Sequence, residues 1–291
     1  MFDALKSPYL VPFDGAFRIK NTASEPPDSS LDNKDYKRLL ADLITELDDQ
    51  QRMLYAQDRF AVLLIFQGMD ASGKDGTVRA VMNGINPAGC QVFSFKQPTV
   101  HELDHDFLWR TARCLPERGR IGIFNRSYYE EVLAVRVHPE YLEAQRLPGK
   151  LDLKNIWRER LESIGGHERH LARNGTVIIK FWLNISKKEQ RKRFLSRIDE
   201  SHKNWKFSES DVRERQYWDA YMSAYQQALA DTSKPWAPWY AIPADHKPYT
   251  HYCVADILVQ SLKSLGLTYP RVDAAQEKKL QQMRKLLDEK N

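Results

Sequence analysis

Residues 61–77 read Ala-Val-Leu-Leu-Ile-Phe-Gln-Gly-Met-Asp-Ala-Ser-Gly-Lys-Asp-Gly-Thr, an apolar run that passes directly into a glycine-bearing loop. A continuous apolar run of this length is typical of a strand buried on both faces of a parallel sheet. Residues 68–77 come close to the pattern Gly-x4-Gly-Lys-[Ser/Thr] of phosphate-binding loops, which lie between a strand and a helix. The stretch therefore predicts an α/β fold that binds phosphate at the carboxyl end of this strand.

Strand and helix patterns alternate along the rest of the chain. The expected strands cover 61–67, 90–96, 120–125, 175–183 and 236–243. The expected helices cover 35–58, 78–85, 103–115, 155–173, 187–198, 249–265 and 273–290. Such alternation predicts a mainly parallel central sheet with helices on both faces. One continuous alternation, without an internal repeat, favours a single α/β domain.

Composition narrows the class of protein. The chain has 291 residues, of which 42% are hydrophobic and 29% charged, which is typical of a soluble globular protein and excludes a wholly disordered one. No run approaches the ~20 apolar residues of a membrane span, and the start lacks a signal-peptide pattern. The three cysteines are scattered, so we expect reduced thiols in a cytoplasmic protein. The net charge of +5 suits an anionic partner but does not require one.

The residues of the phosphate-binding loop (P-loop, residues 68–77) have distinct predicted roles. Backbone N–H groups of such a loop bind phosphate, and Lys74 would place its charge on the transferred phosphoryl group. Asp70 would repel phosphate unless a divalent cation lay between them, so we interpret it as a magnesium-linked carboxylate. Asp75 replaces the usual magnesium-binding Ser or Thr and is better explained as an acid favoured by the helix dipole. The candidate phosphate-binding residues are Gly68, Met69, Ala71, Ser72, Gly73, Lys74, Asp75, Gly76 and Thr77.

A second set of candidates follows the strand expected at 120–125. In P-loop proteins the neighbouring strand ends in an acid that orients magnesium, whereas this chain has Asn125 there. Arg126 would point into the crevice at the carboxyl end of the sheet, and a surface salt bridge is the alternative. Glu130 either contacts a metal or nucleotide or caps the start of a helix.

A third candidate segment, residues 187–197, contains six Lys or Arg residues behind Ser186, a residue suited to cap a helix. A solvated helix face explains such a run most simply. The alternative is a lid whose arginines close over phosphates, and the polar segment 199–207 with its two aromatic residues supports a mobile flap. Tyr225, farther along, is expected to pack in the core. The candidate phosphate contacts of the lid are Arg193, Arg197 and Lys206.

Together these segments resemble the polyphosphate kinase 2 family, P-loop kinases that move phosphoryl groups between inorganic polyphosphate and nucleotides. The resemblance covers about residues 35–265 and rests on five motifs in order. They are Gly-Met-Asp-Ala-Ser-Gly-Lys-Asp-Gly-Thr (68–77), Phe-Leu-Trp-Arg (107–110), Phe-Asn-Arg-Ser-Tyr-Tyr-Glu-Glu (124–131), Ile-Asp-Glu-Ser-His-Lys-Asn-Trp-Lys-Phe-Ser (198–208) and Ala-Pro-Trp-Tyr-Ala-Ile-Pro-Ala-Asp (237–245). The resemblance implies a P-loop kinase-like, three-layer α/β/α fold with a helical lid. It also implies Mg²⁺ at Asp70 and phosphate at Lys74 and Arg126.

Most members of the family have Asp at position 125, and the pair Asn125 and Glu130 resembles its class III branch, which is associated with phosphorylating both AMP and ADP. The resemblance thus implies catalytic roles for Asp70, Lys74, Arg126 and Glu130, with Asn125, Arg126 and Glu130 at the nucleotide. The expected partners are inorganic polyphosphate, AMP, ADP and ATP, with no nucleic acid and no membrane, and we expect a homo-oligomer. An ATP-dependent nucleoside monophosphate kinase and a polyanion-binding protein with an inactive P-loop stay as alternatives.

The expected organisation follows from these assignments. We expect an N-terminal arm over residues 1–34 and a P-loop kinase-like domain over 35–265. Within that domain the lid covers about 187–230, and a C-terminal helix covers 266–291.

Overall fold

The computed structural model describes residues 2–28 and 31–288. The strands in this part of the chain are β1 (Ala61–Gln67), β2 (Cys90–Ser94), β3 (Ile121–Asn125), β4 (Thr176–Asn184) and β5 (Trp239–Pro243). The α-helices are α1 (Asn33–Gln57), α2 (Lys74–Val81), α3 (Val100–Leu103), α4 (Trp109–Ala112), α5 (Ala134–Val137), α6 (Ile156–Arg173), α7 (Lys187–Asp199), α8 (Glu209–Glu214), α9 (Trp218–Thr232), α10 (Lys247–Ser264) and α11 (Ala274–Asp288). The 3-10 helices are η1 (Ile19–Asn21), η2 (Pro87–Gly89), η3 (Tyr128–Val132), η4 (Pro139–Gln145), η5 (Ser201–Lys206) and η6 (Arg215–Tyr217).

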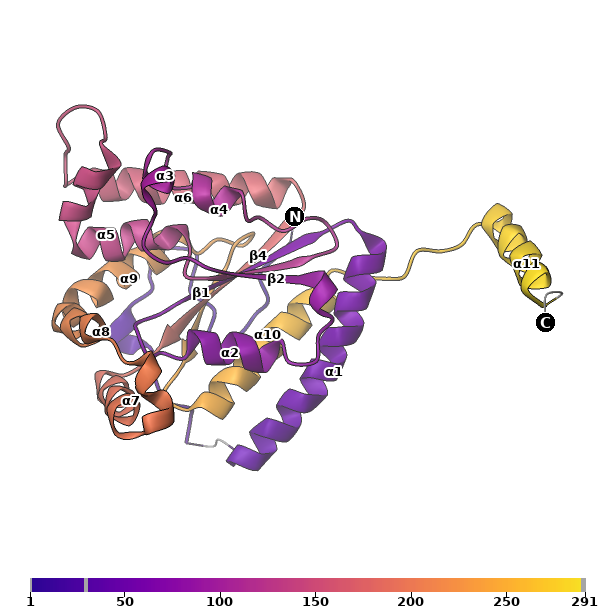
Figure 1. The fold of residues 1–291 in the computed structure, drawn as a ribbon, viewed down its shortest axis with the longest axis horizontal. Coiled ribbons are helices and arrows are strands. Elements are labelled where there is room, and N and C mark those ends of the chain that lie inside the picture. Colours follow the sequence, from indigo (N-terminus) through magenta and orange to yellow (C-terminus); the bar gives the residue numbers. More distant parts are fainter. Residues whose placement is uncertain (1, 29–30, 289–291) are drawn as a thin grey trace.

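The strands form one parallel sheet in the order β2-β3-β1-β4-β5. The apolar run that was expected to be a buried strand is β1, which lies at the centre with every residue buried. One face of the sheet is covered by α1, α2 and α10 and the other by α4, α6 and α9 (Figure 1). The predicted three-layer α/β/α fold is therefore confirmed. The helices α7 and α8 lie beyond the carboxyl end of the strands, where the arrowhead of β4 points (Figure 1).

The N-terminal segment covers one edge of the sheet. Leu10 forms an antiparallel bridge to Tyr240 of β5, and the backbone N–H of Val11 donates to the carbonyl of Trp239 at 2.9 Å. Phe2 and Phe17 are buried in the main core, so the predicted arm is packed against the body. The opposite edge is β2, where Val92 is 53% exposed. The division of the chain into arm, domain and C-terminal helix stays a prediction.

Helix α1 follows its amphipathic sequence closely. Asp32 caps it by accepting hydrogen bonds from the backbone N–H groups of Lys34 and Asp35. Its buried side chains, which include Leu43, Leu47 and Leu54, recur at helical spacing and face α10. None of the helices within residues 2–28 and 31–288 is both long and apolar enough to cross a membrane.

Two of the expected helices differ from the structure by more than two residues. α2 starts at Lys74 and not at 78, because Gly73, with φ +104°, forms the left-handed N-cap. The helix expected over 103–115 is two short helices, α3 and α4, because the Asp106 side chain accepts a hydrogen bond from the backbone of Leu108 at 2.9 Å and favours a turn there. α11 ends at Asp288, and the rest of its expected length lies outside the described residues. It stands apart from the body (Figure 1).

Leu47 tests the packing of α1 on the sheet layer. The side chain is fully buried, so Leu47→Ala should lower the free energy of unfolding by about 2–5 kcal/mol, the usual range for a cavity left by a leucine. Urea unfolding measures this change. The exposed Thr45 on the same helix gives a control, since Thr45→Ala should change stability by less than about 0.5 kcal/mol. Equal stability changes would contradict the packing described here.

Candidate active site

The P-loop has a glycine at each end, Gly68 after β1 and Gly73 before α2, and any other residue at either position would be strained. Gly68 has φ +153°, and a Cβ there would lie 2.9 Å from the carbonyl oxygen of Leu183 on β4. Gly73 has φ +104° and begins α2. The loop therefore turns tightly against β4 and directs the start of α2 toward the carboxyl end of the sheet, as a phosphate-binding loop requires.

Lys74 lies under the loop with its ammonium group on backbone oxygens. Its Nζ donates to the carbonyls of Gly68 at 2.6 Å and Met69 at 3.2 Å. Burial and the positive charge of Arg126 lower the pKa of Lys74, whereas the negative charges of Asp70, Glu130 and Asp75 oppose that shift. The charges of the other candidate site residues therefore act on Lys74, while its ammonium group is bonded to the loop backbone.

Arg126 and Asp70 form an ion pair across the crevice. The Arg126 Nη2 lies 2.7 Å from Asp70 Oδ1. Arg126 has φ +62°, and its backbone N–H donates to the carbonyl of Phe66 at 3.0 Å, so the residue leaves the sheet in a sharp turn. The negative charge of Glu130, and then that of Asp70, raises the pKa of the guanidinium. The structure thus shows Arg126 in a salt bridge, as the alternative expected, with the candidate metal residue Asp70 as its partner, and a phosphate contact by Arg126 stays a prediction.

Glu130 lies in η3, where its neighbours are turned inward. Ser127 makes the N-terminal capping contact of η3 by accepting a hydrogen bond from the backbone of Tyr129 at 3.1 Å. Tyr128, Tyr129 and Glu131 are buried, whereas Glu130 is half-buried. Its charge acts on both Arg126 and Lys74. Within residues 128–131, Glu130 is thus the one residue that is not fully buried, and its predicted contact with metal or nucleotide stays a prediction.

Asn125 and Asp75 form a hydrogen bond between the end of β3 and the first turn of α2. The Asn125 side-chain amide donates to the Asp75 carboxylate and lies 3.5 Å from the Ser94 hydroxyl on β2. Asp75 is in the first turn of α2, as expected, and its carboxylate is directed to the end of β3. An aspartate at position 125 would place a second carboxylate against Asp75, which explains in physical terms why an amide suits this position.

The basic helix α7 is hydrogen-bonded to the backbone of the P-loop through Arg193. Arg193 is buried, and its Nη1 donates to the carbonyls of Ala71 at 2.9 Å and Ser72 at 3.0 Å. Its remaining N–H groups bond to Glu189 and to the carbonyls of Ala244 and Asp245. Because all five guanidinium N–H groups have acceptors, Arg193 in this arrangement positions the loop and presents no donor to phosphate. A phosphate contact by Arg193 stays a prediction.

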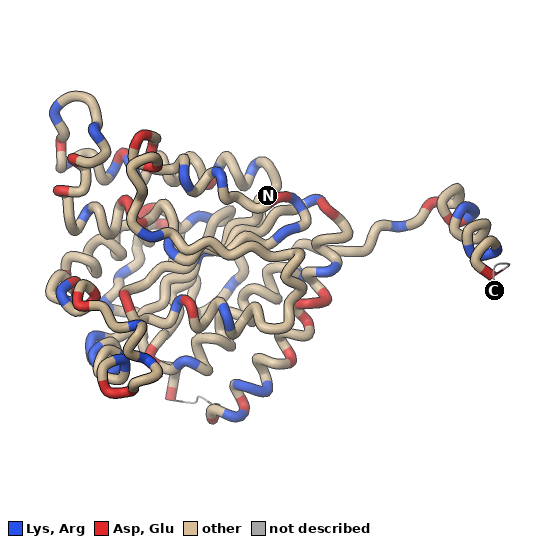
Figure 2. Tube along the Cα trace, in the orientation of Figure 1, with Lys and Arg blue, Asp and Glu red and all other residues tan. Residues whose placement is uncertain are grey.

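The other two lid candidates lie farther out. Arg197 pairs with Asp211 of α8 at 2.9 Å, which links the two lid helices. Lys206 is exposed at the end of η5 with its ammonium 4.9 Å from the Trp205 ring centre. Lys and Arg are concentrated along α7 (Figure 2). The residues of this run that point outward are the exposed Lys187, Lys188, Arg191 and Lys192.

The structure brings two residues to the site that sequence reasoning had not placed there. Burial raises the pKa of Asp211, and the negative charge of the nearby Asp70 raises it further. Tyr225 of α9 packs in the core as expected, but its pKa is raised by burial and then by the charges of Glu130 and Asp70. Helical periodicity predicts burial of Tyr225, and nothing local in the sequence indicates which charges its hydroxyl faces.

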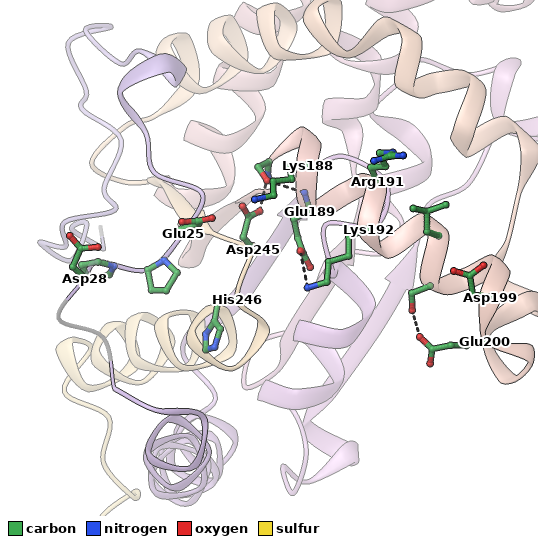
Figure 3. Close-up of a pocket in the computed structure, with 15 residues that line it drawn as sticks. Glu25, Asp28, Lys188, Glu189, Arg191, Lys192, Asp199, Glu200, Asp245 and His246 are labelled. Carbon is green, nitrogen blue, oxygen red and sulfur yellow. Dashed lines mark hydrogen bonds and ion pairs between the residues drawn. The ribbon is translucent and has the colours of Figure 1, made fainter.

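A cavity of about 1170 Å³ lies on the outer side of α7, between that helix and residues 25–28 (Figure 3). Its basic residues are Lys188, Arg191 and Lys192, and Lys192 pairs with Glu189 at 3.7 Å. Its acidic residues are Glu25, Asp28, Glu189, Asp199, Glu200 and Asp245. A lining with more acids than bases does not suit a polyanion, so the P-loop crevice is the better candidate site.

Comparisons with known proteins agree with this geometry. The family model of Polyphosphate kinase 2 (PPK2) matches residues 30–268. A Rhodopseudomonas palustris protein named ADP-polyphosphate phosphotransferase is 56% identical over 253 residues, 87% of this chain and 88% of that protein. The AMP/ADP-polyphosphate phosphotransferase of Meiothermus ruber is 42% identical over 93% of this chain and 97% of that protein. The crystal structure of Polyphosphate Kinase 2 from Arthrobacter aurescens TC1 matches with a TM-score of 0.83 and 36% identity, covering 96% and 98% of the two chains.

Arg193 and Lys192 allow a matched test of the support given by α7. Both substitutions to Met remove one positive charge, but only Arg193→Met leaves the Ala71 and Ser72 carbonyls without their donor. We expect Arg193→Met to lower the free energy of unfolding by about 2 kcal/mol or more and to raise hydrogen exchange in the P-loop. Lys192 is 80% exposed, so Lys192→Met should change stability by less than about 0.5 kcal/mol. If the two variants changed stability and P-loop exchange equally, the Arg193 hydrogen bonds would not stabilise the loop, and α7 would contribute only positive charge.

Proposed function

Since the chain belongs to the polyphosphate kinase 2 family, we propose that it transfers the terminal phosphoryl group of inorganic polyphosphate to AMP and ADP, giving ADP and ATP. The observation that carries the proposal is the cluster of Lys74, Asp70 and Arg126 at the end of β1 and β3. The names of the two relatives, at 56% and 42% identity, support polyphosphate as donor and adenine nucleotides as acceptors.

Positioning and charge neutralisation supply most of the rate enhancement in phosphoryl transfer. In this structure each of the two cations is paired with an oxygen of the P-loop, Lys74 with the Gly68 carbonyl and Arg126 with the Asp70 carboxylate. Phosphate oxygens replace the Gly68 carbonyl on Lys74 and the Asp70 carboxylate on Arg126. The two cations then hold the moving phosphoryl group, and the Asp70 carboxylate becomes free.

We propose Mg²⁺ as the metal that Asp70 holds. Asp75 is engaged by Asn125, which leaves Asp70 as the P-loop acid able to take a cation. Within residues 2–28 and 31–288, no group of three or more His, Cys, Asp or Glu residues is placed to hold a metal. This fits Mg²⁺, which proteins commonly bind through one or two carboxylates together with substrate phosphates. When bound, the ion would neutralise negative charge on the substrate phosphates.

Two expectations about the whole protein belong to the proposal. The free edge at β2 (Cys90–Ser94) carries no charge and no proline, which natural edges commonly use as protection, and this supports a homo-oligomer. Three free cysteines, Cys90, Cys114 and Cys253, support a reducing compartment such as the cytoplasm.

A donor comparison tests the proposed function. The protein is incubated with polyphosphate and AMP, polyphosphate and ADP, or ATP and AMP, and nucleotide products are quantified. We expect products in both polyphosphate reactions, and Asp70→Asn should lower turnover by ~10²-fold, the scale of one lost electrostatic contact in the transition state. The exposed Asp199 provides the control variant Asp199→Asn, which should keep turnover within about 2-fold of wild type.

The alternatives predict other outcomes in the same assay. Products from ATP and AMP but none from polyphosphate would identify an ATP-dependent nucleoside monophosphate kinase. Polyphosphate binding without any turnover would identify a polyanion-binding protein. Wild-type turnover of Asp70→Asn throughout a magnesium titration would remove Asp70 from the metal site.

Glu130 and Asn125 test acceptor choice. AMP presents one phosphate and ADP two, so the reacting oxygen lies at different depths for the two acceptors. Because the charge of Glu130 acts on Arg126, Glu130→Ala should lower turnover by ~10-fold more for one acceptor than for the other. Asn125→Asp, which places a carboxylate against Asp75, should also shift the ratio. The exposed Glu143 gives the control Glu143→Ala, and an unchanged AMP/ADP ratio in both site variants would contradict this role.

A further inference from the structure

A buried polar network lies behind the candidate site, within the interior of the protein. The Lys180 Nζ on β4 lies 2.5 Å from Glu168 Oε2 of α6 and 2.9 Å from the Tyr129 hydroxyl. The Lys180 Nζ also donates to the Thr232 carbonyl at 2.9 Å. The other Glu168 oxygen accepts from the Tyr128 and Tyr129 hydroxyls, both at 2.9 Å. We call Lys180, Glu168, Tyr128, Tyr129 and Thr232 the Lys180 network.

Burying the charges of the Lys180 network carries a large desolvation cost. The Lys180 side chain is 0% exposed and the Glu168 side chain 1%, so both charges have lost their water. A buried ion pair often contributes no more stability than apolar residues of similar volume, because desolvation offsets the attraction. Burial lowers the pKa of Lys180 to about 8, against the opposing charge of Glu168, so the lysine is still charged at neutral pH. Stability alone therefore gives no reason for this pair.

The network is connected to the segment that carries the candidate catalytic side chains. Tyr128 and Tyr129 lie between Arg126 and Glu130 in the chain, and η3 is only five residues long. A 3-10 helix of this length has little stability of its own. Both tyrosine hydroxyls donate to Glu168 of α6, and the Tyr129 hydroxyl also accepts from Lys180 of β4. These bonds therefore fix the orientation of η3 relative to α6 and β4.

A second contact from α6 holds the other side of Glu130. The Arg160 Nη1 lies 3.0 Å from Glu131 Oε1, and the Gln145 amide donates to the same oxygen at 2.9 Å. Tyr128, Tyr129 and Glu131 are thus all bonded into the interior, on both sides of Glu130. Glu130 is half-buried between these anchored residues, and its charge raises the pKa of Arg126.

We propose that the Lys180 network is a positioning device that fixes Glu130 and Arg126 at the phosphoryl-transfer site through the hydroxyls of Tyr128 and Tyr129. The inference rests on the proposed function of Arg126 and Glu130. Lys180 and Glu168 act through the tyrosines and do not touch substrate. Their expected contribution is to turnover, because a misdirected Glu130 or Arg126 weakens transition-state contacts more than substrate binding.

Two variants separate positioning from stability. The double variant Lys180→Met/Glu168→Met removes both charges at similar volume, so the protein should stay folded. Tyr129→Phe removes one hydroxyl and keeps the ring. We expect turnover to fall ~30-fold or more in the first and ~10-fold in the second, with the polyphosphate KM within about 3-fold of wild type. The control is Tyr240→Phe, which removes a buried hydroxyl bonded to the Leu5 carbonyl at 3.0 Å, and it should keep wild-type turnover.

A coupling experiment tests whether the network acts through Glu130. If it does, Glu130→Ala should reduce turnover much less in the Tyr129→Phe background than in wild type, because both changes remove the same arrangement. In the Tyr240→Phe background, Glu130→Ala should keep its full effect. Multiplicative losses for Tyr129→Phe and Glu130→Ala, or a folded double Met variant with wild-type turnover, would overturn the inference.

Hydrogen exchange gives a readout that needs no catalysis. Tyr129→Phe should speed exchange of the backbone amides of residues 126–131 by about 10-fold, and Tyr240→Phe should leave them unchanged. Equal exchange in wild type and Tyr129→Phe would overturn the inference even in an active enzyme. Faster exchange in Tyr129→Phe, combined with a wild type that shows no polyphosphate-dependent turnover, would overturn the proposed function and leave the positioning of residues 126–131 standing.

Discussion

The pairing of β1 with β3 and β4 is the constraint on which the rest of the site depends. Phe66 lies opposite Asn125, and the backbone N–H of Arg126 continues the ladder to the Phe66 carbonyl at 3.0 Å. On the other side, Gly68 comes so close to Leu183 of β4 that a side chain would not fit. Parallel strands end at the same edge of a sheet, so the P-loop and the Arg126 turn must share one crevice.

Charged side chains of both signs lie together in this crevice. Lys74 and Arg126 face Asp70 and Glu130, and Asp211 of the lid region adds a further acid near Asp70. Each cation has an oxygen of the protein as its partner, the Gly68 carbonyl for Lys74 and the Asp70 carboxylate for Arg126. Under the proposed function, phosphate oxygens would take the place of these partners with little rearrangement of the backbone.

Support for the site comes from both directions. α7 holds the P-loop carbonyls through Arg193 and Gln190, which donates to the Asp70 carbonyl at 3.0 Å. α6 and β4 hold η3 through Glu168 and Lys180. Both supports use fully hydrogen-bonded charged groups in the interior, where partly satisfied ones would be costly. One face of α7, with Arg193 and Gln190, is bonded to the P-loop, whereas the other lysines and arginines of its first half are exposed to solvent.

Local sequence determined the β1 strand, the P-loop with Lys74 and Asp70, and the end of β3 just before Arg126, because apolar runs, glycines and neighbouring polar residues act over a few positions. The motifs also indicated the family that the comparisons confirmed. Only the tertiary structure decided that Arg193 supports the loop, that Asp75 meets Asn125, and that Lys180 and Glu168 connect to η3. Helical spacing made Arg193 and Arg197 equivalent, yet one is buried under the loop and the other pairs with Asp211. Side-chain partners separated by tens of residues depend on how helices pack against the sheet, and periodicity along the chain carries no information about that packing.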